Sequence, residues 1–286
     1  MPTVVYDGNK QGGLEGGEFT REGFDNVGGG NAGDEGEEND MTRRKYSPDM
    51  MAPSYHYEHP YREEIEALEY RPWQLDVGSI TKSDEKITVH HHKDDHGVLI
   101  STEEELAQLA TRITEGQESG EIQEIALDLE AHSHRTFAGF VCLIQLSIRR
   151  PKSSESPTSP PDIATGYDFL IDALSLRHAI PAHLGPILTS PHILKIMHGA
   201  DSDIPWLQRV FGCYIVNLFD TGRASRALKF PSAGLAYLLR KYAGVEAEKV
   251  HQLSDRRRRP LPEDMREYAV SDTRYLLDIY DQYTYL

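Results

Sequence analysis

The sequence predicts an α/β fold in which a mixed β-sheet carries helices on both of its faces. Two observations support this fold class. Three apolar segments with strand character follow one another in the middle of the chain, and strands then alternate with helical segments towards its end. Three strands in series followed by such an alternation imply a mixed sheet with helices packed against it.

Length and composition narrow the classes of protein to consider. At about 100–200 residues per domain, the 286 residues correspond to one or two domains. Cys142 and Cys213 lie in apolar stretches and leave no room for a disulfide framework, which favours a reducing, intracellular compartment. Since no apolar run reaches the roughly 18 residues of a membrane span, no membrane is expected as a partner. The net charge of −16 argues against non-specific coating of nucleic acid.

Composition divides the chain into three parts. Residues 1–50 are acidic and Gly-rich and are predicted to be disordered, because they cannot bury enough apolar surface to offset chain entropy. Residues 51–100 carry aromatic residues and prolines without a clear period, and we expect an extended segment that packs on the domain at 101–286. The cluster His90–His92 fits no tetrahedral zinc pattern and is interpreted as a solvated loop. A Ser/Pro-rich insertion at 151–161 predicts a long loop.

Helices and strands are assigned from periodicity and from capping signals. A helix is expected after Ser101, where either Ser101 or Thr102 can form a capping box with the glutamate three residues later. A last, long helix is expected to begin near Pro262, which suits a first-turn position, and to run to the end of the chain. The predicted strands are Glu124–Glu130, Phe140–Ile148, Phe169–Ile171, Leu194–His198 and Ile215–Phe219, and the other predicted helices are Ser202–Phe211, 221–228 and 234–243.

Asp128 and Glu130 end the first of these strands. Residues two positions apart on a strand point to the same side of the sheet, so the two carboxylates are neighbours. Because two ionised carboxylates side by side repel each other, a fold keeps such a pair mainly where a cation neutralises it. The pattern Asp-x-Glu is weak on its own, since most examples are solvent-facing.

Two further carboxylates occupy suggestive positions. Asp203 lies near the start of a helix just after a strand, where a helix cap is the alternative role, although Ser202 or Asp201 could fill it equally well. Asp272 lies four residues after Tyr268 on the last helix, hence on the same face. Asp272 shares its helix face with apolar residues such as Ala269 and Leu276. An acidic side chain on such a face is unusual unless a function requires its charge.

Taken in chain order, Asp-Leu-Glu at 128–130, His-Gly-Ala-Asp-Ser-Asp at 198–203 and Tyr-x-x-x-Asp at 268–272 resemble the DEDD exonucleases of the Tyr subclass, the ribonuclease D-type 3′→5′ exonucleases. The resemblance covers about residues 55–286. Further segments are similar to the nuclear, exosome-associated exoribonucleases of this family: Tyr57–Tyr61, Trp206–Gln208, Leu218–Thr221, Gln252–Asp255 and Arg259–Pro262.

The resemblance implies an RNase H-like fold and two divalent metal ions, Mg²⁺ or Mn²⁺, at the site. It implies a 3′→5′ exoribonuclease that releases 5′-nucleotides from single-stranded RNA 3′ ends and works with the RNA exosome core in nuclear RNA processing. The nucleus, and the nucleolus within it, is then the expected location, and the catalytic domain is expected to be monomeric.

The resemblance also assigns roles to individual residues. Asp128 would bridge both metals, Glu130 and Asp272 would complete the first metal site, and Asp203 would support the second. Tyr268 would orient the attacking water. The residues that match substrate-contact positions of the family are His198, Gly199, Trp206, Lys249 and Gln252. A core position is the alternative for Trp206.

This chain departs from the family pattern at three places. Ala131 stands where the family usually carries His, so the expected substrate contact is missing or is supplied by His132. Arginines from Arg256 to Arg258 stand where the family usually has Trp followed by Arg-Ile-Arg, which puts a packed, apolar loop in doubt. The last predicted helix reaches Leu286 with no HRDC-type helical domain after it, so we expect either a catalytic region cut from a longer protein or a protein without that domain.

Three alternative functions stay open at this point. Within the same fold, the protein could be a DNA-directed 3′→5′ exonuclease. From another class, it could be an inactive scaffold that docks RNA-processing partners through its N-terminal segment. A zinc-dependent role for His90–His92 is a more distant alternative.

Overall fold

The computed structural model describes residues 58–70, 97–134, 136–150, 161–246 and 254–284. The chain divides into two units, and the fold below is that of the unit containing Tyr61–Leu286. The predictions for residues 1–50, for the histidine cluster and for most of the Ser/Pro-rich insertion lie outside the described residues, as do Lys249 and Gln252. The three-part division of the chain stays a prediction.

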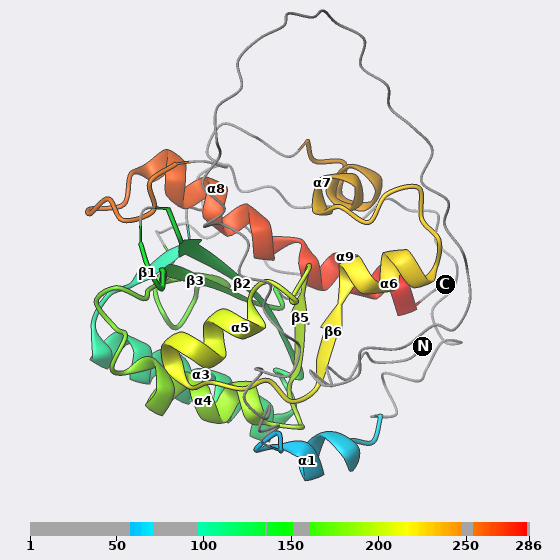
Figure 1. The fold of residues 1–286 in the computed structure, drawn as a ribbon, viewed down its shortest axis with the longest axis horizontal. Helices are drawn as coiled ribbons and strands as arrows, with labels where there is room; N and C mark the ends of the chain where they lie inside the picture. The colour runs from blue at the N-terminus through cyan, green and yellow to red at the C-terminus, as the bar shows by residue number, and fades with distance from the viewer. Residues whose placement is uncertain (1–57, 71–96, 135, 151–160, 247–253, 285–286) are drawn as a thin grey trace, which may run out of the picture. The chain divides into compact units, whose positions relative to one another are not determined.

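A six-stranded mixed sheet forms the centre of this unit, as the sequence predicts (Figure 1). The strand order is β1-β4-β3-β2-β5-β6. β3 pairs antiparallel with both β2 and β4, whereas β1 with β4, β2 with β5 and β5 with β6 pair in parallel. The strands are β1 (Val98–Ile100), β2 (Glu124–His132), β3 (Phe140–Ile148), β4 (Asp168–Asp172), β5 (Leu194–Met197) and β6 (Leu218–Asp220).

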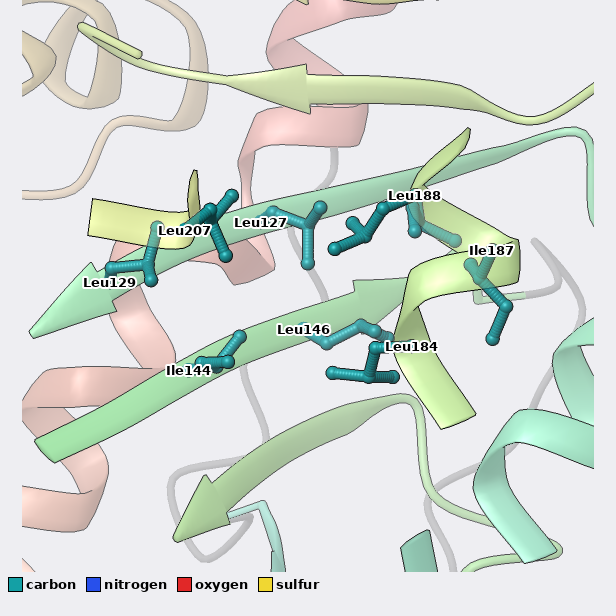
Figure 2. A pocket seen from close by; sticks show the side chains of 9 residues that line it. Leu127, Leu129, Ile144, Leu146, Leu184, Ile187, Leu188 and Leu207 are labelled. Atoms are coloured by element: carbon teal, nitrogen blue, oxygen red, sulfur yellow. The ribbon is translucent and has the colours of Figure 1, made fainter. Parts of the chain in front are cut away.

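One face of the sheet packs against helices from the first two thirds of the fold (Figure 1). The odd-numbered residues of β2, such as Leu127 and Leu129, point to this face because side chains alternate along a strand. A small void lined only by aliphatic side chains lies here, between β2, β3, α4 and η2 (Figure 2). The elements on this face are α3 (Glu103–Ser119), α4 (Ile180–Thr189), α5 (Ile204–Trp206) and the π-helical turn η2 (Leu207–Phe211).

The opposite face packs against the C-terminal helices. Even-numbered residues of β2 up to Glu130 and odd-numbered residues of β3 from Leu143 onwards point this way, so Ala126 joins the cluster with α9 and Leu143 joins the cluster with α8. Ser147 Oγ of β3 lies 2.8 Å from Thr273 Oγ1 of α8. The elements on or next to this face are α6 (Thr221–Ala227), α7 (Leu235–Leu238), η3 (Leu239–Ala243), α8 (Glu263–Arg274) and α9 (Leu276–Thr284).

Several predicted elements differ in detail from the structure. The last helix does not run unbroken, because Tyr275 separates α8 from α9. The strand predicted at Ile215–Phe219 is shorter and begins at Leu218. β1 and α4 were not predicted; α4 contains Pro181 in its first turn and Pro186 in its interior, residues that discourage a helix assignment from sequence.

The described part of the segment before the catalytic domain contains a short helix. This helix, α1 (Arg62–Glu66), follows Tyr61, whose ring centroid lies 5.7 Å from that of Tyr214. Thr102 and Glu105 form the predicted capping box at the start of α3. Among the described helices, none is long and apolar enough to cross a membrane.

Candidate active site

Asp128 and Glu130 lie near the C-terminal end of β2, on the face of the sheet that carries α8. Asp128 stands opposite Gln145 of β3, and Glu130 stands opposite Leu143. A register shift follows directly, between Glu130 and Ala131. Since a bulge of this kind locally redirects a strand, the two carboxylates mark the last regular part of β2. Both side chains are half-buried.

Asp203 and Asp272 reach the same region from two helices. Asp203 is the buried N-cap residue of α5, yet its side chain makes no capping hydrogen bond. The helix-cap alternative for Asp203 is therefore not what the structure shows. Asp272 is half-buried on α8, one turn after Tyr268. The sheet thus supplies two carboxylates and two helices supply one each.

The electrostatics show that the four carboxylates act on one another. Burial raises the pKa of Asp128 well above its usual range, and the negative charges of the other three, Asp203, Asp272 and Glu130, raise it further. Burial, followed by the charges of Asp220 and Glu130, raises the pKa of Asp203 to about 7. The cluster is therefore one electrostatic unit, although its members come from three separate segments of the chain.

Asp272 and Tyr268 belong to the same unit. Burial and the charge of Glu130 raise the pKa of Asp272 to about 7, against the opposing effect of Arg256. Burial raises the pKa of the Tyr268 phenol, and the charge of Asp272 adds to the rise. Tyr268 is therefore protonated at neutral pH. In the absence of a cation, the cluster retains protons that isolated aspartates would release.

Arg256 places a positive charge against this cluster. Its Nη2 lies 2.7 Å from Glu130 Oε1, and its guanidinium carbon lies 4.8 Å from the centroid of the Tyr268 ring. The residue is buried. Burial raises the pKa of Glu130, whereas the charge of Arg256 and its hydrogen bond lower it. Sequence reasoning offered phosphate contact or a solvated loop as the role of this run of arginines and did not predict the contact of Arg256 with Glu130.

The donor set fits hard divalent cations. The four carboxylates supply only oxygen ligands, which Mg²⁺ and Mn²⁺ prefer. One arginine balances four acidic side chains, and the buried amide of Gln145, opposite Asp128, has no hydrogen-bond partner among the described residues. No three His, Cys, Asp or Glu side chains in the described part of the chain are arranged as a ready-made ligand set.

Asp220 was missed by the sequence reasoning and organises the loop that carries Asp203. Its Oδ1 accepts hydrogen bonds from the backbone N–H groups of Gly199, Gly222 and Arg223, at 3.1, 2.7 and 3.0 Å. Its Oδ2 accepts one from the N–H of Ala200 at 2.8 Å. The carboxylate therefore caps α6 and ties the turn after β5 to it. Its position between a strand and a helix is a typical N-cap signal.

His198 and Gly199, two of the predicted substrate contacts, lie in this same turn. His198 Nδ1 lies 2.9 Å from Thr221 Oγ1. Burial lowers the pKa of His198, so the ring is neutral at physiological pH. Gly199 has a φ of 73°, a left-handed conformation that favours glycine. The turn is thus fixed by Asp220 and Thr221, on the segment that follows β6.

Trp206 lies one turn after Asp203 and is half-buried. The edge of its indole packs against Gly139, where any side chain would collide with it. The guanidinium carbon of Arg209 lies 4.2 Å from the indole centroid. Arg209 therefore covers one face of the indole and Gly139 covers an edge. Trp206 is thus partly packed into the protein and partly exposed.

A family model described as a 3′-5′ exonuclease matches residues 98–284, more than half of the chain. Exosome complex component 10 of Mus musculus is 45% identical over 184 residues, which are 64% of this chain and 18% of that protein. The exosome complex exonuclease RRP6 of Saccharomyces cerevisiae is 39% identical over 239 residues, which are 84% of this chain and 28% of that protein.

Solved structures give a similar result. The catalytic core of RRP6 from Trypanosoma brucei matches with a TM-score of 0.63 and 32% identity, over 79% of this chain and 55% of that chain. Escherichia coli RNase D, an exoribonuclease involved in structured RNA processing, matches with a TM-score of 0.52 and 28% identity, over 65% of this chain and 43% of that chain. The present chain spans less than a third of either full-length relative named above.

Proposed function

The chain belongs to the 3′-5′ exonuclease family and has its RNase H-like fold; from this premise we propose that it is a metal-dependent 3′→5′ exoribonuclease. It would release 5′-nucleotides one at a time from single-stranded RNA 3′ ends. The observation that carries the proposal is the mutual electrostatic effect of Asp128, Glu130, Asp203 and Asp272. Burying several like charges together costs free energy unless a bound cation neutralises them. The cluster is therefore best explained by a function that uses such a cation.

Four carboxylates are proposed to hold two divalent ions, Mg²⁺ or Mn²⁺. On the family resemblance, Asp128 would hold both ions. Glu130 and Asp272 would complete one ion site, and Asp203 would support the other. Bound there, the ions would supply an activated water and would stabilise the negative charge that develops on the scissile phosphate.

The chain's own residues would position water and substrate. The protonated phenol of Tyr268, held next to Asp272, would donate a hydrogen bond that orients the attacking water. His198 is neutral and has its Nδ1 engaged by Thr221, which leaves Nε2 as the ring atom for a substrate contact. The terminal base would stack on the part of Trp206 that Gly139 and Arg209 do not cover.

RNA and the exosome are proposed as substrate and partner. The support is the names of the relatives, which are exosome components and exosome exonucleases. An exosome role would place the protein in the nucleus, including the nucleolus, and the catalytic domain would act as a monomer. Lys249 and Gln252 are proposed to contact the substrate, on the resemblance alone.

The direct test is a gel assay with 5′-labelled single-stranded RNA and Mg²⁺, run beside a DNA oligonucleotide of the same sequence. We expect a ladder of shortened products that EDTA abolishes and that RNA yields faster than DNA. Asp128→Asn and Asp203→Asn should remove the ladder. The matched control is Asp201→Asn, because Asp201 is an exposed aspartate two residues before Asp203 and pairs with Arg223 at the surface.

Different outcomes separate the alternatives. A ladder that survives Asp128→Asn would refute the assigned site. Faster cleavage of DNA than RNA would favour a DNA-directed exonuclease. If no ladder forms and calorimetry detects neither Mg²⁺ nor Mn²⁺ binding in the presence of nucleotide, an inactive scaffold becomes the better account.

A further inference from the structure

Arg256 occupies an unusual place for an arginine. It is 4% exposed, although it opens a run of four consecutive arginines in the loop before α8. Its guanidinium pairs with Glu130 at 2.7 Å and lies over the Tyr268 ring. A buried cation thus touches one carboxylate of the cluster and the tyrosine beside it.

Its neighbours in the same run have other partners. Arg257 pairs with the exposed Asp255 at 2.7 Å. Arg259 pairs with Asp172 of β4 at 2.6 Å and donates a second hydrogen bond to the carbonyl of Cys142 at 3.0 Å. Arg258 is exposed. Of these four arginines, Arg256 is therefore the one directed at the carboxylate cluster.

Arg256 depends on Glu130 for neutralisation. The guanidinium is buried, and its Nη2 lies 2.7 Å from Glu130 Oε1, so the contact with Glu130 is the main compensation for its charge. A buried charge whose partner is withdrawn is strongly destabilised. Any cation that draws Glu130 away from Arg256 must therefore offset that loss.

We propose that Arg256 is an internal counter-cation of the carboxylate cluster, one that competes with divalent ions for Glu130 and weakens their binding. The inference rests on the proposed function, in which Glu130 is a metal ligand. Two effects act in the same direction. Arg256 stabilises the protein without metal by neutralising Glu130, and it repels a divalent ion that enters beside it.

Two uncharged replacements remove the guanidinium from Glu130, and they differ in the size of the side chain that is left at position 256. We therefore expect Arg256→Trp to behave like Arg256→Gln in its metal affinity. Arg256→Lys retains the positive charge and should stay close to the wild-type affinity.

Calorimetric titration of the full chain with Mn²⁺, in the presence of AMP as product, tests the proposal. We expect the dissociation constant for Mn²⁺ to fall by about tenfold in Arg256→Gln and in Arg256→Trp. Arg258→Gln is the matched control, because it removes the same charge from an exposed position of the same loop. Its affinity should stay within about twofold of wild type, since exposed charges are screened.

Thermal unfolding supplies a second readout that does not depend on activity. Without metal, Arg256→Gln should unfold at a lower temperature than the wild type, because Glu130 loses its partner. With saturating Mn²⁺, the increase in Tm should be larger for Arg256→Gln than for wild type. A structural role alone would lower Tm in both conditions by the same amount.

The outcomes distinguish this inference from the proposed function. An unchanged or weaker Mn²⁺ affinity in Arg256→Gln, with wild-type binding intact, overturns the counter-cation role only. The same holds if Arg256→Gln weakens AMP binding alone, which would assign the arginine to the substrate phosphate. If the wild-type protein binds no Mn²⁺ with AMP present, the proposed function fails together with the inference.

Discussion

The hydroxyl group of Tyr268 can be removed without changing any carboxylate of the site, so its contribution to the cleavage rate can be measured separately. Its phenol is protonated because burial and the charge of Asp272 raise its pKa. We expect Tyr268→Phe to lower the rate of RNA cleavage by about a hundredfold, a typical effect of losing one positioned proton donor. Single-turnover kinetics measures the rate.

The control for Tyr268→Phe is metal binding. Phenylalanine keeps the ring that lies beneath the Arg256 guanidinium and removes only the hydroxyl. The Mn²⁺ affinity should therefore stay within about twofold of wild type, whereas a large loss of metal affinity would contradict a role limited to orienting water.

Asp220 supports the site indirectly: its carboxylate accepts hydrogen bonds from backbone N–H groups and not from the side chains of the carboxylate cluster. Asp220→Ala removes an acceptor of four backbone hydrogen bonds, and we expect it to lower the free energy of unfolding by about 1–3 kcal/mol. RNA cleavage should fall as well, because the turn before Asp203 loses its anchor. Urea denaturation and the gel assay measure the two effects.

Asp201→Ala is the comparison for Asp220→Ala. Asp201 lies in the same turn, but its ion pair with Arg223 is largely exposed. An exposed pair contributes less than about 1 kcal/mol, so a similar loss of stability in both variants would show that the buried acceptor has no special role.

At the scale of elements, the site depends on how β2 and β3 are held against α4. Leu146 of β3 pairs with Leu127 of β2, next to Asp128, and both line the apolar void (Figure 2). Leu146→Ala should lower the free energy of unfolding by about 2–5 kcal/mol, because it enlarges a void that already exists. Chemical denaturation measures the change.

A surface leucine provides the reference for that substitution. Leu174 is 37% exposed, and Leu174→Ala should change the free energy of unfolding by no more than about 0.5 kcal/mol. If Leu146→Ala were equally mild, the void would be able to collapse, and the packing beneath Asp128 would be softer than the structure indicates.

For the whole molecule, the carboxylate cluster links stability to pH. The pKa values of Asp203 and Asp272 are about 7 in the folded, metal-free protein, above the ordinary value of about 4 for an aspartate. Between about pH 4 and about pH 7, the folded protein therefore binds more protons than the unfolded chain. Its free energy of unfolding should decrease as the pH rises through that window.

Saturating Mg²⁺ should reduce this decrease, because bound cations favour the ionised carboxylates. Urea denaturation at about pH 5 and about pH 8, with EDTA or with Mg²⁺, measures the effect. Asp203→Asn should flatten the pH dependence in EDTA relative to wild type. An equal pH dependence in the presence and absence of Mg²⁺ would contradict metal binding by these groups.

Much of the architecture could be predicted from local patterns. The alternation of strands and helices gave the mixed sheet with helices on both faces, and Thr102 with Glu105 gave the start of α3. The missed elements have physical explanations. β1 has only three residues, too few for a period to be read, and two prolines obscure α4.

The spacing of the functional groups within each element can be read from the amino-acid sequence without a structure. Asp128 and Glu130 share one side of a strand because side chains alternate, and Tyr268 and Asp272 share a helix face because a turn takes about four residues. These relations follow from backbone geometry alone. They need no knowledge of the rest of the chain.

Only the tertiary structure decided which groups meet. The charges of Asp203, before α5, and of Asp272, on α8, act on Asp128 of β2, although the three residues are far apart in the sequence. The pairing of Arg256 with Glu130 joins residues more than a hundred positions apart. No local pattern distinguishes Arg256 from the three arginines that follow it. Its burial, and with it a cation beside the carboxylates, is a consequence of the fold.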